Sequence, residues 1–113
     1  MKDHTYHVYL VTNPSRTALY LGVTNNLAAR LYEHYSSRGN EYTWAGKHYC
    51  YNLVYYEVFQ YIDKAIDREK QIKRWSRKKK NDLINRVNPS WKFLNDEFPY
   101  DPEQSERKHL WSG

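Results

Sequence analysis

Two short runs of strand-forming residues near the amino terminus limit the fold more than any other feature of the chain. Residues 6–11 and 19–23 are rich in β-branched and aromatic side chains, and the turn-forming sequence Asn-Pro-Ser-Arg occupies residues 13–16 between them. Two such runs joined by turn residues predict a β-hairpin. A four-residue loop sets Tyr9 opposite Tyr20, so we expect both phenols on one face of the sheet.

A helix is predicted directly after the hairpin. Residues 24–26 (Thr-Asn-Asn) supply capping side chains, and residues 27–35 carry a helical pattern. Arg30 and His34 form a polar row beside an apolar stripe. The stripe repeats every four residues and is expected to face the core: Leu27, Leu31 and Tyr35.

The rest of the chain predicts one domain of mixed α and β structure. Residues 36–46 contain two glycines and are expected to form a loop, whereas the apolar and aromatic run at 51–59 predicts a third strand. Helices are predicted at 62–74 and 81–87. From residue 95 the chain becomes acidic and contains prolines, so we expect a domain at 1–94 and an extended or disordered tail at 95–113.

Glu69 is the strongest anomaly in this pattern. At about 100° per residue it falls between Ala65 and Ile66, in the middle of the apolar stripe of the helix at 62–74. A carboxylate that faces inward needs a cation or hydrogen-bond donors to offset the cost of desolvation. One ordinary explanation is an ion pair between Glu69 and Arg30.

Basic residues follow Glu69 closely. The chain carries a net charge of +5 and has a pI near 9.3, which favours a polyanionic partner but does not distinguish DNA, RNA and an anionic lipid surface. The run is either a solvated helix face or a phosphate-binding patch, and Trp75 within it either fills the core or stacks on a base. The candidate nucleic-acid-binding residues are Lys73, Arg74, Arg77, Lys78, Lys79 and Lys80.

Other features exclude several classes of protein. A single cysteine, Cys50, rules out an intramolecular disulfide and a zinc site built from cysteines. No apolar run approaches the roughly 18 residues of a membrane span, and the first residues lack the hydrophobic segment of a signal peptide. We therefore expect a cytoplasmic protein that does not associate with membranes.

Several of these residues together resemble the GIY-YIG nuclease superfamily. Its name motif corresponds to His7-Val8-Tyr9 and Tyr20-Leu21-Gly22, followed by Arg30, His34 and Glu69. The resemblance covers residues 5–94. In particular, Gly22-Val23-Thr24-Asn25 and Trp75-Ser76-Arg77-Lys78-Lys79 are similar to small single-domain members, which are related to the nuclease domain of the bacterial nucleotide-excision repair excinuclease.

The resemblance implies a fold and an activity. The implied fold is an α+β type within the α/β class, with a small three-stranded, largely antiparallel sheet flanked by helices. The implied activity is a metal-dependent endonuclease that hydrolyses phosphodiester bonds in DNA, in repair or recombination, with Mg²⁺ or Mn²⁺ as cofactor. The family's catalytic positions fall on Tyr9, Tyr20, Arg30, His34 and Glu69.

Each of these residues suits one task in phosphodiester hydrolysis. Glu69 would bind the metal, and Arg30 would hold the phosphate through its fork of donors. Tyr9 or Tyr20 would activate the attacking water, and His34 would act as a hydrogen-bond partner or alternative base.

The sequence also departs from the family pattern at several positions. His7 replaces the first glycine of the name motif, and Val23 stands where excision-repair relatives carry lysine. The family's late asparagine has no clear match, because Asn81 and Asn88 both compete for the position.

Alternatives to a DNA nuclease stay open at this stage. Taken singly, the two tyrosines could be ordinary strand aromatics, and Arg30 and His34 could be solvated helix residues. The main rival is a nucleic-acid-binding module with the same fold and little or no turnover, and a weaker one is a nuclease that acts on RNA. Specificity would come from a protein partner, a DNA structure or very short recognition, and the sequence leaves the oligomeric state unknown.

Overall fold

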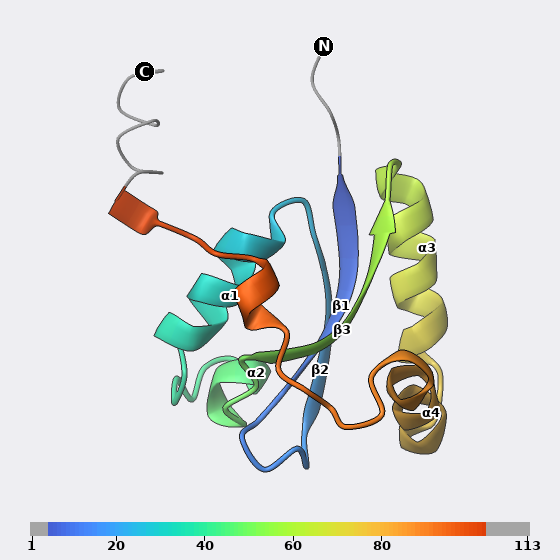
Figure 1. Cartoon of the computed structure of the whole chain (residues 1–113), viewed down its shortest axis with the longest axis horizontal. Helices are drawn as coiled ribbons and strands as arrows, with labels where there is room; N and C mark the ends of the chain where they lie inside the picture. Colours follow the sequence, from blue (N-terminus) through green and yellow to red (C-terminus); the bar gives the residue numbers. More distant parts are fainter. Residues whose placement is uncertain (1–4, 104–113) are drawn as a thin grey trace.

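A three-stranded antiparallel sheet lies at the centre of the computed structural model, which describes residues 5–103 (Figure 1). The strands are β1 (Tyr6–Thr12), β2 (Leu19–Thr24) and β3 (Asn52–Phe59). Their order across the sheet is β2-β1-β3, and β1 is antiparallel to both neighbours. The expected three-stranded antiparallel sheet is therefore confirmed.

Helices cover both faces of this sheet. Figure 1 shows α1 and α2 on one side and α3 and α4 on the other. None of the helices within residues 5–103 is long and apolar enough to cross a membrane. The helices and the 3₁₀ turn η1 have the bounds α1 (Leu27–Ser36), α2 (Trp44–Lys47), α3 (Ile62–Lys73), α4 (Arg77–Val87) and η1 (Asn95–Glu97).

Side-chain capping explains the two differences from the predicted helices. α2 lies at the end of the predicted loop, where the Thr43 hydroxyl accepts a hydrogen bond from the backbone N–H of Gly46. α4 begins four residues before the predicted start at 81, because the Ser76 hydroxyl accepts from the backbone N–H of Lys79. Both residues are N-caps of a common type.

The central strand β1 is buried on both of its faces. Val8 and Leu10 pack with residues of α3 and α4, whereas Tyr9 and Val11 pack with Leu27 and other residues on the α1 side. Successive residues of a strand point to opposite faces, so a strand covered by helices on both sides needs a continuous apolar run. This requirement accounts for the sequence of residues 8–11.

The helix α1 presents a different stripe from the one expected. Leu27 and Leu31 are buried as predicted, but Tyr35 is 48% exposed and His34 is buried at 6% exposure. The buried positions are thus i, i+4 and i+7, which follow the period of 3.6 residues more closely than a strict repeat of four. The predicted row of Arg30 and His34 therefore turns toward the sheet.

The register of the hairpin differs from the prediction by two residues. Thr12 is opposite Leu19, so Tyr9 lies opposite Gly22 rather than Tyr20. The loop is longer than expected because the Asn13 side chain accepts from the backbone N–H groups of Thr17 and Ala18. A shift of two residues keeps each side chain on its face, so both phenols still point toward α1.

The segment that follows α4 packs along β3. Asn88 donates to the Val54 carbonyl, and the Asn95 amide donates to the Tyr51 carbonyl while it accepts from the backbone of Leu53. The packed chain therefore extends beyond the domain boundary expected at residue 94, and residues 104–113 of the expected tail lie outside the described residues. Within the described chain no strand pairs with the outer edge of β2.

Gly22 is required where Tyr9 crosses the neighbouring strand. A Cβ atom at Gly22 would lie 2.5 Å from Cζ of the Tyr9 ring and in contact with its hydroxyl. We expect Gly22→Ala to lower the free energy of unfolding by about 1–3 kcal/mol, because overpacking forces the ring out of its position. Urea denaturation measures this change.

A double-mutant comparison isolates the contact. In a Tyr9→Val background the opposing ring is absent, so Gly22→Ala should cost less than about 0.5 kcal/mol. An equal cost in both backgrounds would mean that the glycine is needed for another reason.

Candidate active site

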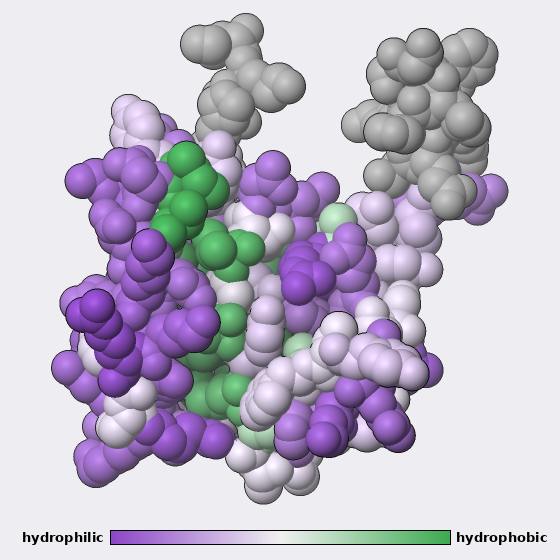
Figure 2. Space-filling model, turned by 180° about the vertical axis from the view of Figure 1, so that it is seen from behind, coloured by the Kyte–Doolittle hydropathy of each residue, from purple (hydrophilic) through white to green (hydrophobic). Residues whose placement is uncertain are grey.

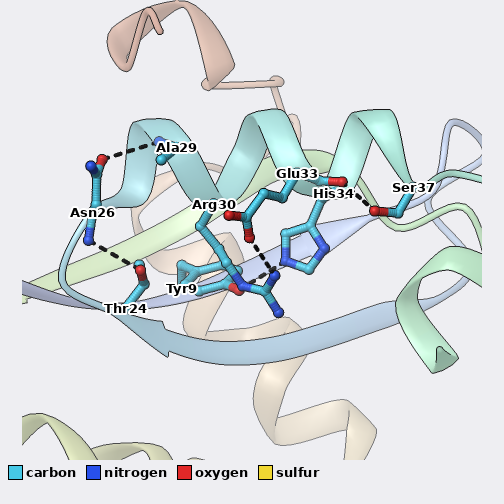
Figure 3. A network of polar contacts seen from close by, with 8 residues as sticks. All are labelled: Tyr9, Thr24, Asn26, Ala29, Arg30, Glu33, His34 and Ser37. Atoms are coloured by element: carbon cyan, nitrogen blue, oxygen red, sulfur yellow. Dashed lines mark hydrogen bonds and ion pairs between the residues drawn. The ribbon is translucent and has the colours of Figure 1, made fainter. Parts of the chain in front are cut away.

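Tyr9 lies beneath α1 and does not reach solvent. Its side chain is 1% exposed, and its hydroxyl is 2.8 Å from Nε2 of His34 (Figure 3). Burial raises the pKa of Tyr9 far above its ordinary value, and the nearby charge of Arg30 offsets only part of that rise. The phenol therefore keeps its proton at neutral pH.

His34 is the buried partner of this phenol. Burial, reinforced by the charge of Arg30, lowers the pKa of His34 to about 4. The imidazole is consequently neutral near pH 7, with one nitrogen able to accept a hydrogen bond and the other able to donate one. His34 also contacts the edge of the Tyr20 ring, with 5.4 Å between the ring centroids.

Arg30 extends from α1 toward the same place. Its Nη1 lies 2.9 Å from Oε1 of Glu33, one turn along the helix, and Figure 3 shows the guanidinium beside the Tyr9 hydroxyl. The expected alternative, an ion pair between Arg30 and Glu69, is wrong, because Glu33 takes that role. Both members of the pair are partly exposed, so the bond orients the guanidinium more than it stabilises the fold.

Tyr20 connects this cluster to the other side of the sheet. A pocket of about 160 Å³, here called the α1 pocket, is lined by Tyr20, Arg30, His34 and Trp44 among others. A second pocket of about 260 Å³, the α3 pocket, is lined by Leu19, Tyr20, Leu21, Trp44, Glu69, Lys73 and Lys80. Tyr20 and Trp44 border both pockets, so the two form adjoining parts of one site around the β2 edge.

Glu69 reaches this site from α3, on the opposite face of the sheet from α1. Ala65 and Ile72 hold α3 against the core, and Glu69 lies between them in sequence, half-buried. The Glu69 side chain therefore lies at the rim of the core, beside the β2 edge, and not in the middle of the apolar face as the sequence predicted. No side chain within residues 5–103 pairs with its carboxylate.

The structure divides the predicted basic patch into two groups. Lys73 and Lys80 line the α3 pocket beside Glu69. Three others have partners elsewhere: Arg77 donates to the Thr17 carbonyl, Lys78 pairs with Asp82, and Lys79 lies over the Trp75 ring. Arg74 is exposed and lines neither pocket.

Trp75 and the two candidate asparagines have structural roles. Trp75 packs against the core, which is one of the two roles predicted for it; the other was stacking on a base. Asn88 is 9% exposed and uses its amide to bond the backbone of Val54 and Lys92, while Asn81 accepts from Arg77. Neither asparagine lines the α1 or α3 pocket.

The residues at the α3 pocket fit a hard divalent cation. Glu69 offers a half-buried carboxylate without a partner, which is the type of oxygen ligand that Mg²⁺ takes. Within the described residues there is no group of three or more His, Cys, Asp or Glu side chains that could hold a metal ion. A cation at Glu69 would therefore take most of its ligands from water and a bound anion.

Trp44 lines both pockets, and the sequence did not identify it as a site residue. It begins α2, half of its side chain is exposed, and it stacks near Tyr20 with 6.5 Å between the ring centroids. The glycines at 39 and 46 favoured a loop in this region. The Thr43 cap was the available signal for a short helix that fixes the ring.

The buried state of His34 generates a prediction for stability against pH. Because its folded pKa is lowered to about 4, the unfolded chain binds a proton at this residue between pH 6.5 and 4, whereas the folded chain does not. Stability should therefore fall as the pH drops through this window, by up to about 3 kcal/mol from this group.

Chemical denaturation across this pH range tests the prediction. His34→Gln keeps a hydrogen-bonding side chain but cannot titrate, so its unfolding free energy should change less between pH 6.5 and 4 than that of the wild type. Parallel profiles for the two proteins would contradict the assignment, and NMR titration of the His34 ring provides an independent measurement.

Comparisons with known proteins identify the family of this chain. A sequence profile of the GIY-YIG catalytic domain matches residues 5–82. A UPF0213 protein from Bacillus pumilus is 37% identical over 87 residues, which cover 77% of this chain and 86% of that protein. A UPF0213 protein from Haloquadratum walsbyi is 33% identical over 78 residues, which cover 69% and 85%.

A solved structure is also similar. The NMR structure of a UPF0213 protein from Bacillus halodurans matches 74% of this chain and 86% of its own length, with 27% sequence identity and a TM-score of 0.48. The profile match and the relatives together show that this chain belongs to the GIY-YIG domain family, as a small protein of the UPF0213 type.

Proposed function

We propose that this protein is a metal-dependent endonuclease that hydrolyses phosphodiester bonds in DNA. The observation that carries the proposal is that Arg30 and Glu69, from helices on opposite faces of the sheet, line two pockets that adjoin at Tyr20. The Arg30 guanidinium and the unpaired Glu69 carboxylate lie on either side of the Tyr20 phenol. Together they supply the groups that phosphoryl transfer to water needs.

Arg30 would hold the phosphate that is cut. Its guanidinium lies in the α1 pocket, and its charge interacts with the phenols of Tyr9 and Tyr20. Because Arg30 remains charged, its donors can neutralise the negative charge that develops on the phosphoryl oxygens. The bond to Glu33 keeps the guanidinium near this position before the substrate binds.

Tyr20 is the phenol that would act as the base: after its own hydroxyl proton has passed to solvent, its oxygen would accept a proton from the attacking water. The sequence left Tyr9 and Tyr20 as alternatives, but Tyr9 is buried and holds its proton firmly, whereas Tyr20 borders both pockets. Water adds to phosphorus, the bond to the sugar oxygen breaks, and that oxygen takes a proton from solvent. Tyr9 and His34 would support this step by positioning Arg30 and Tyr20.

Glu69 would hold Mg²⁺ or Mn²⁺ at the α3 pocket. When bound, such a cation supplies positive charge to the phosphate and to the leaving oxygen. Since the site offers one carboxylate, we expect weak metal affinity in the absence of DNA. Lys73 and Lys80 would guide the adjacent backbone phosphates into the pocket.

The biological setting is also part of the proposal. The likeness to the nuclease domain of the nucleotide-excision repair excinuclease supports a role in DNA repair or recombination in the cytoplasm. The net charge of +5 suits a nucleic-acid substrate.

Cleavage of supercoiled, single-stranded, flapped and branched DNA tests the proposal. With Mg²⁺ or Mn²⁺, the wild type should cut at least one of these substrates, and excess EDTA should abolish cutting. Glu69→Gln, Arg30→Ala and Tyr20→Phe should each lower the rate by about 100-fold or more, because each removes a charge or a proton acceptor used in the transition state.

Matched variants control for general effects of charge and handling. Asp67→Asn removes an exposed carboxylate from the same helix as Glu69, and Arg86→Ala removes an exposed cation, so both should cut at the wild-type rate. If Glu69→Gln and Arg30→Ala cut as fast as these controls, the site is wrong. If pure wild type binds DNA but never cuts, the protein is a binding module, and cleavage of RNA alone would redirect the proposal to an RNA nuclease.

The two groups of basic residues should differ in their effect on DNA binding. In EDTA, Lys73→Gln with Lys80→Gln should weaken binding and reduce the slope of log K against log salt by about 0.7–0.9 per lysine, the value expected for lost phosphate contacts. Lys78→Gln with Lys79→Gln removes the same charge outside the pocket and should change the slope less. Equal changes would mean that the α3 pocket is not the phosphate path.

A further inference from the structure

An exposed tryptophan ring stands at the junction of the two pockets. Trp44 borders the α1 pocket and the α3 pocket, and its side chain is 50% exposed. Other aromatic side chains of this chain are equally exposed, but Trp44 is the exposed ring that borders both pockets, where cations also stand. None of the roles assigned above to Arg30, Tyr20 and Glu69 uses this ring.

The ring is held in place by its surroundings. His48 lies 4.2 Å from Trp44 between ring centroids, and Tyr20 approaches at 6.5 Å with an angle of 26° between the ring planes. The backbone of α2 is fixed as well, because Gly46 packs so closely that a Cβ atom there would lie 2.7 Å from the Asn40 carbonyl oxygen. Trp44 is therefore a preorganised surface, which lowers the entropic cost of binding a flat ligand.

The groups around the ring are of the kind that binds a nucleic-acid strand. The cations Arg30, Lys73 and Lys80 line the two pockets that Trp44 borders. Figure 2 shows, on the side opposite the view of Figure 1, a strip of hydrophobic surface flanked by hydrophilic side chains. A combination of cationic groups and an exposed aromatic face is the pattern by which proteins bind single strands, with phosphates on the cations and a base on the ring.

We propose that Trp44 stacks on an unpaired base of the DNA strand, next to the phosphate held by Arg30, and so directs the enzyme to single-stranded or unpaired DNA. This inference rests on the proposed function and names its substrate class. Bases of an intact duplex present only their edges, because their faces are covered by neighbouring base pairs. A duplex therefore offers Trp44 nothing to stack on unless a base leaves the helix.

Binding measured without metal tests this inference separately from catalysis. The probes are a fluorescein-labelled oligodeoxythymidylate and a blunt DNA duplex of equal length, in EDTA, followed by fluorescence anisotropy. The wild type should bind the single strand more tightly, and Trp44→Ala should weaken that binding by about 5- to 100-fold, the range for one lost base stack, with little change for the duplex. An RNA oligonucleotide of the same length serves as a third arm.

Three further variants make the result specific. Trp44→Phe keeps an aromatic face and should retain most of the affinity, whereas Trp44→Leu fills similar space without a ring and should behave like Trp44→Ala. Tyr42→Ala removes a ring that is 97% exposed in the same segment but lines neither pocket, so it should bind like the wild type. Circular dichroism melting shows whether each variant is folded.

The outcomes separate this inference from the proposed function. Loss of single-strand binding by Trp44→Ala and Trp44→Leu, with no cleavage by any protein, would support the stacking role and overturn the nuclease. Unchanged single-strand affinity in both variants, or equal loss on single strand and duplex, would overturn the stacking role. A preference of the wild type for duplex, or binding to RNA only, would also overturn it.

Discussion

Burial of β1 on both faces is the constraint from which the rest of the structure follows. β1 has strands on both edges and helices on both faces, so residues 8–12 have essentially no exposed surface. A reaction that needs water and a polyanion cannot take place on such a strand. The segment after α4 covers β3, which leaves the β2 edge as the place where side chains from both helical layers can meet around one strand.

This arrangement gives the buried and the accessible groups different electrostatic roles. Tyr9 and His34 are both buried and both neutral at pH 7, so they form a rigid support without an uncompensated charge in the core. The charged groups, Arg30 and Glu69, stand at the pocket rims, where water can solvate them until a substrate replaces it. In the proposed mechanism Tyr20 lies between these two regions, with its hydroxyl available to water and its ring held by His34 and Trp44.

Sequence patterns predicted the helices and strands, because these depend on local periodicity and residue type, whereas the candidate site residues came from the resemblance to the GIY-YIG family. The hairpin, the helix that begins at residue 27, the strand near 52 and the helix that begins at 62 are all confirmed. The register of the hairpin could not be read from turn residues, because it depends on the hydrogen bonds that the Asn13 side chain makes across the loop. Tyr35 was predicted to lie in the core because a strict repeat of four residues was assumed. The helical period is 3.6 residues, so His34 occupies that buried position.

Longer-range contacts account for the remaining differences. The acidic and proline-containing composition after residue 94 suggested a free tail, but Phe98 packs against His7 and Tyr56, and Asn95 bonds the edge of β3. This packing also explains how the chain tolerates His7 where the family has glycine: the ring is enclosed by aromatic edges from Tyr56 and Phe98. Composition alone cannot show that a distant segment will supply such a cover.

The position of Arg30 and Glu69 on opposite faces of the sheet has a consequence for metal binding in the proposed mechanism. Glu69 brings one carboxylate to the α3 pocket, and the two lysines that line the same pocket disfavour a cation there while the pocket is empty. A phosphate that enters between Arg30 and these lysines would neutralise their charge and add oxygen ligands near Glu69. Metal and DNA would therefore bind with positive coupling, each raising the affinity for the other, because the substrate completes a site that the protein leaves unfinished.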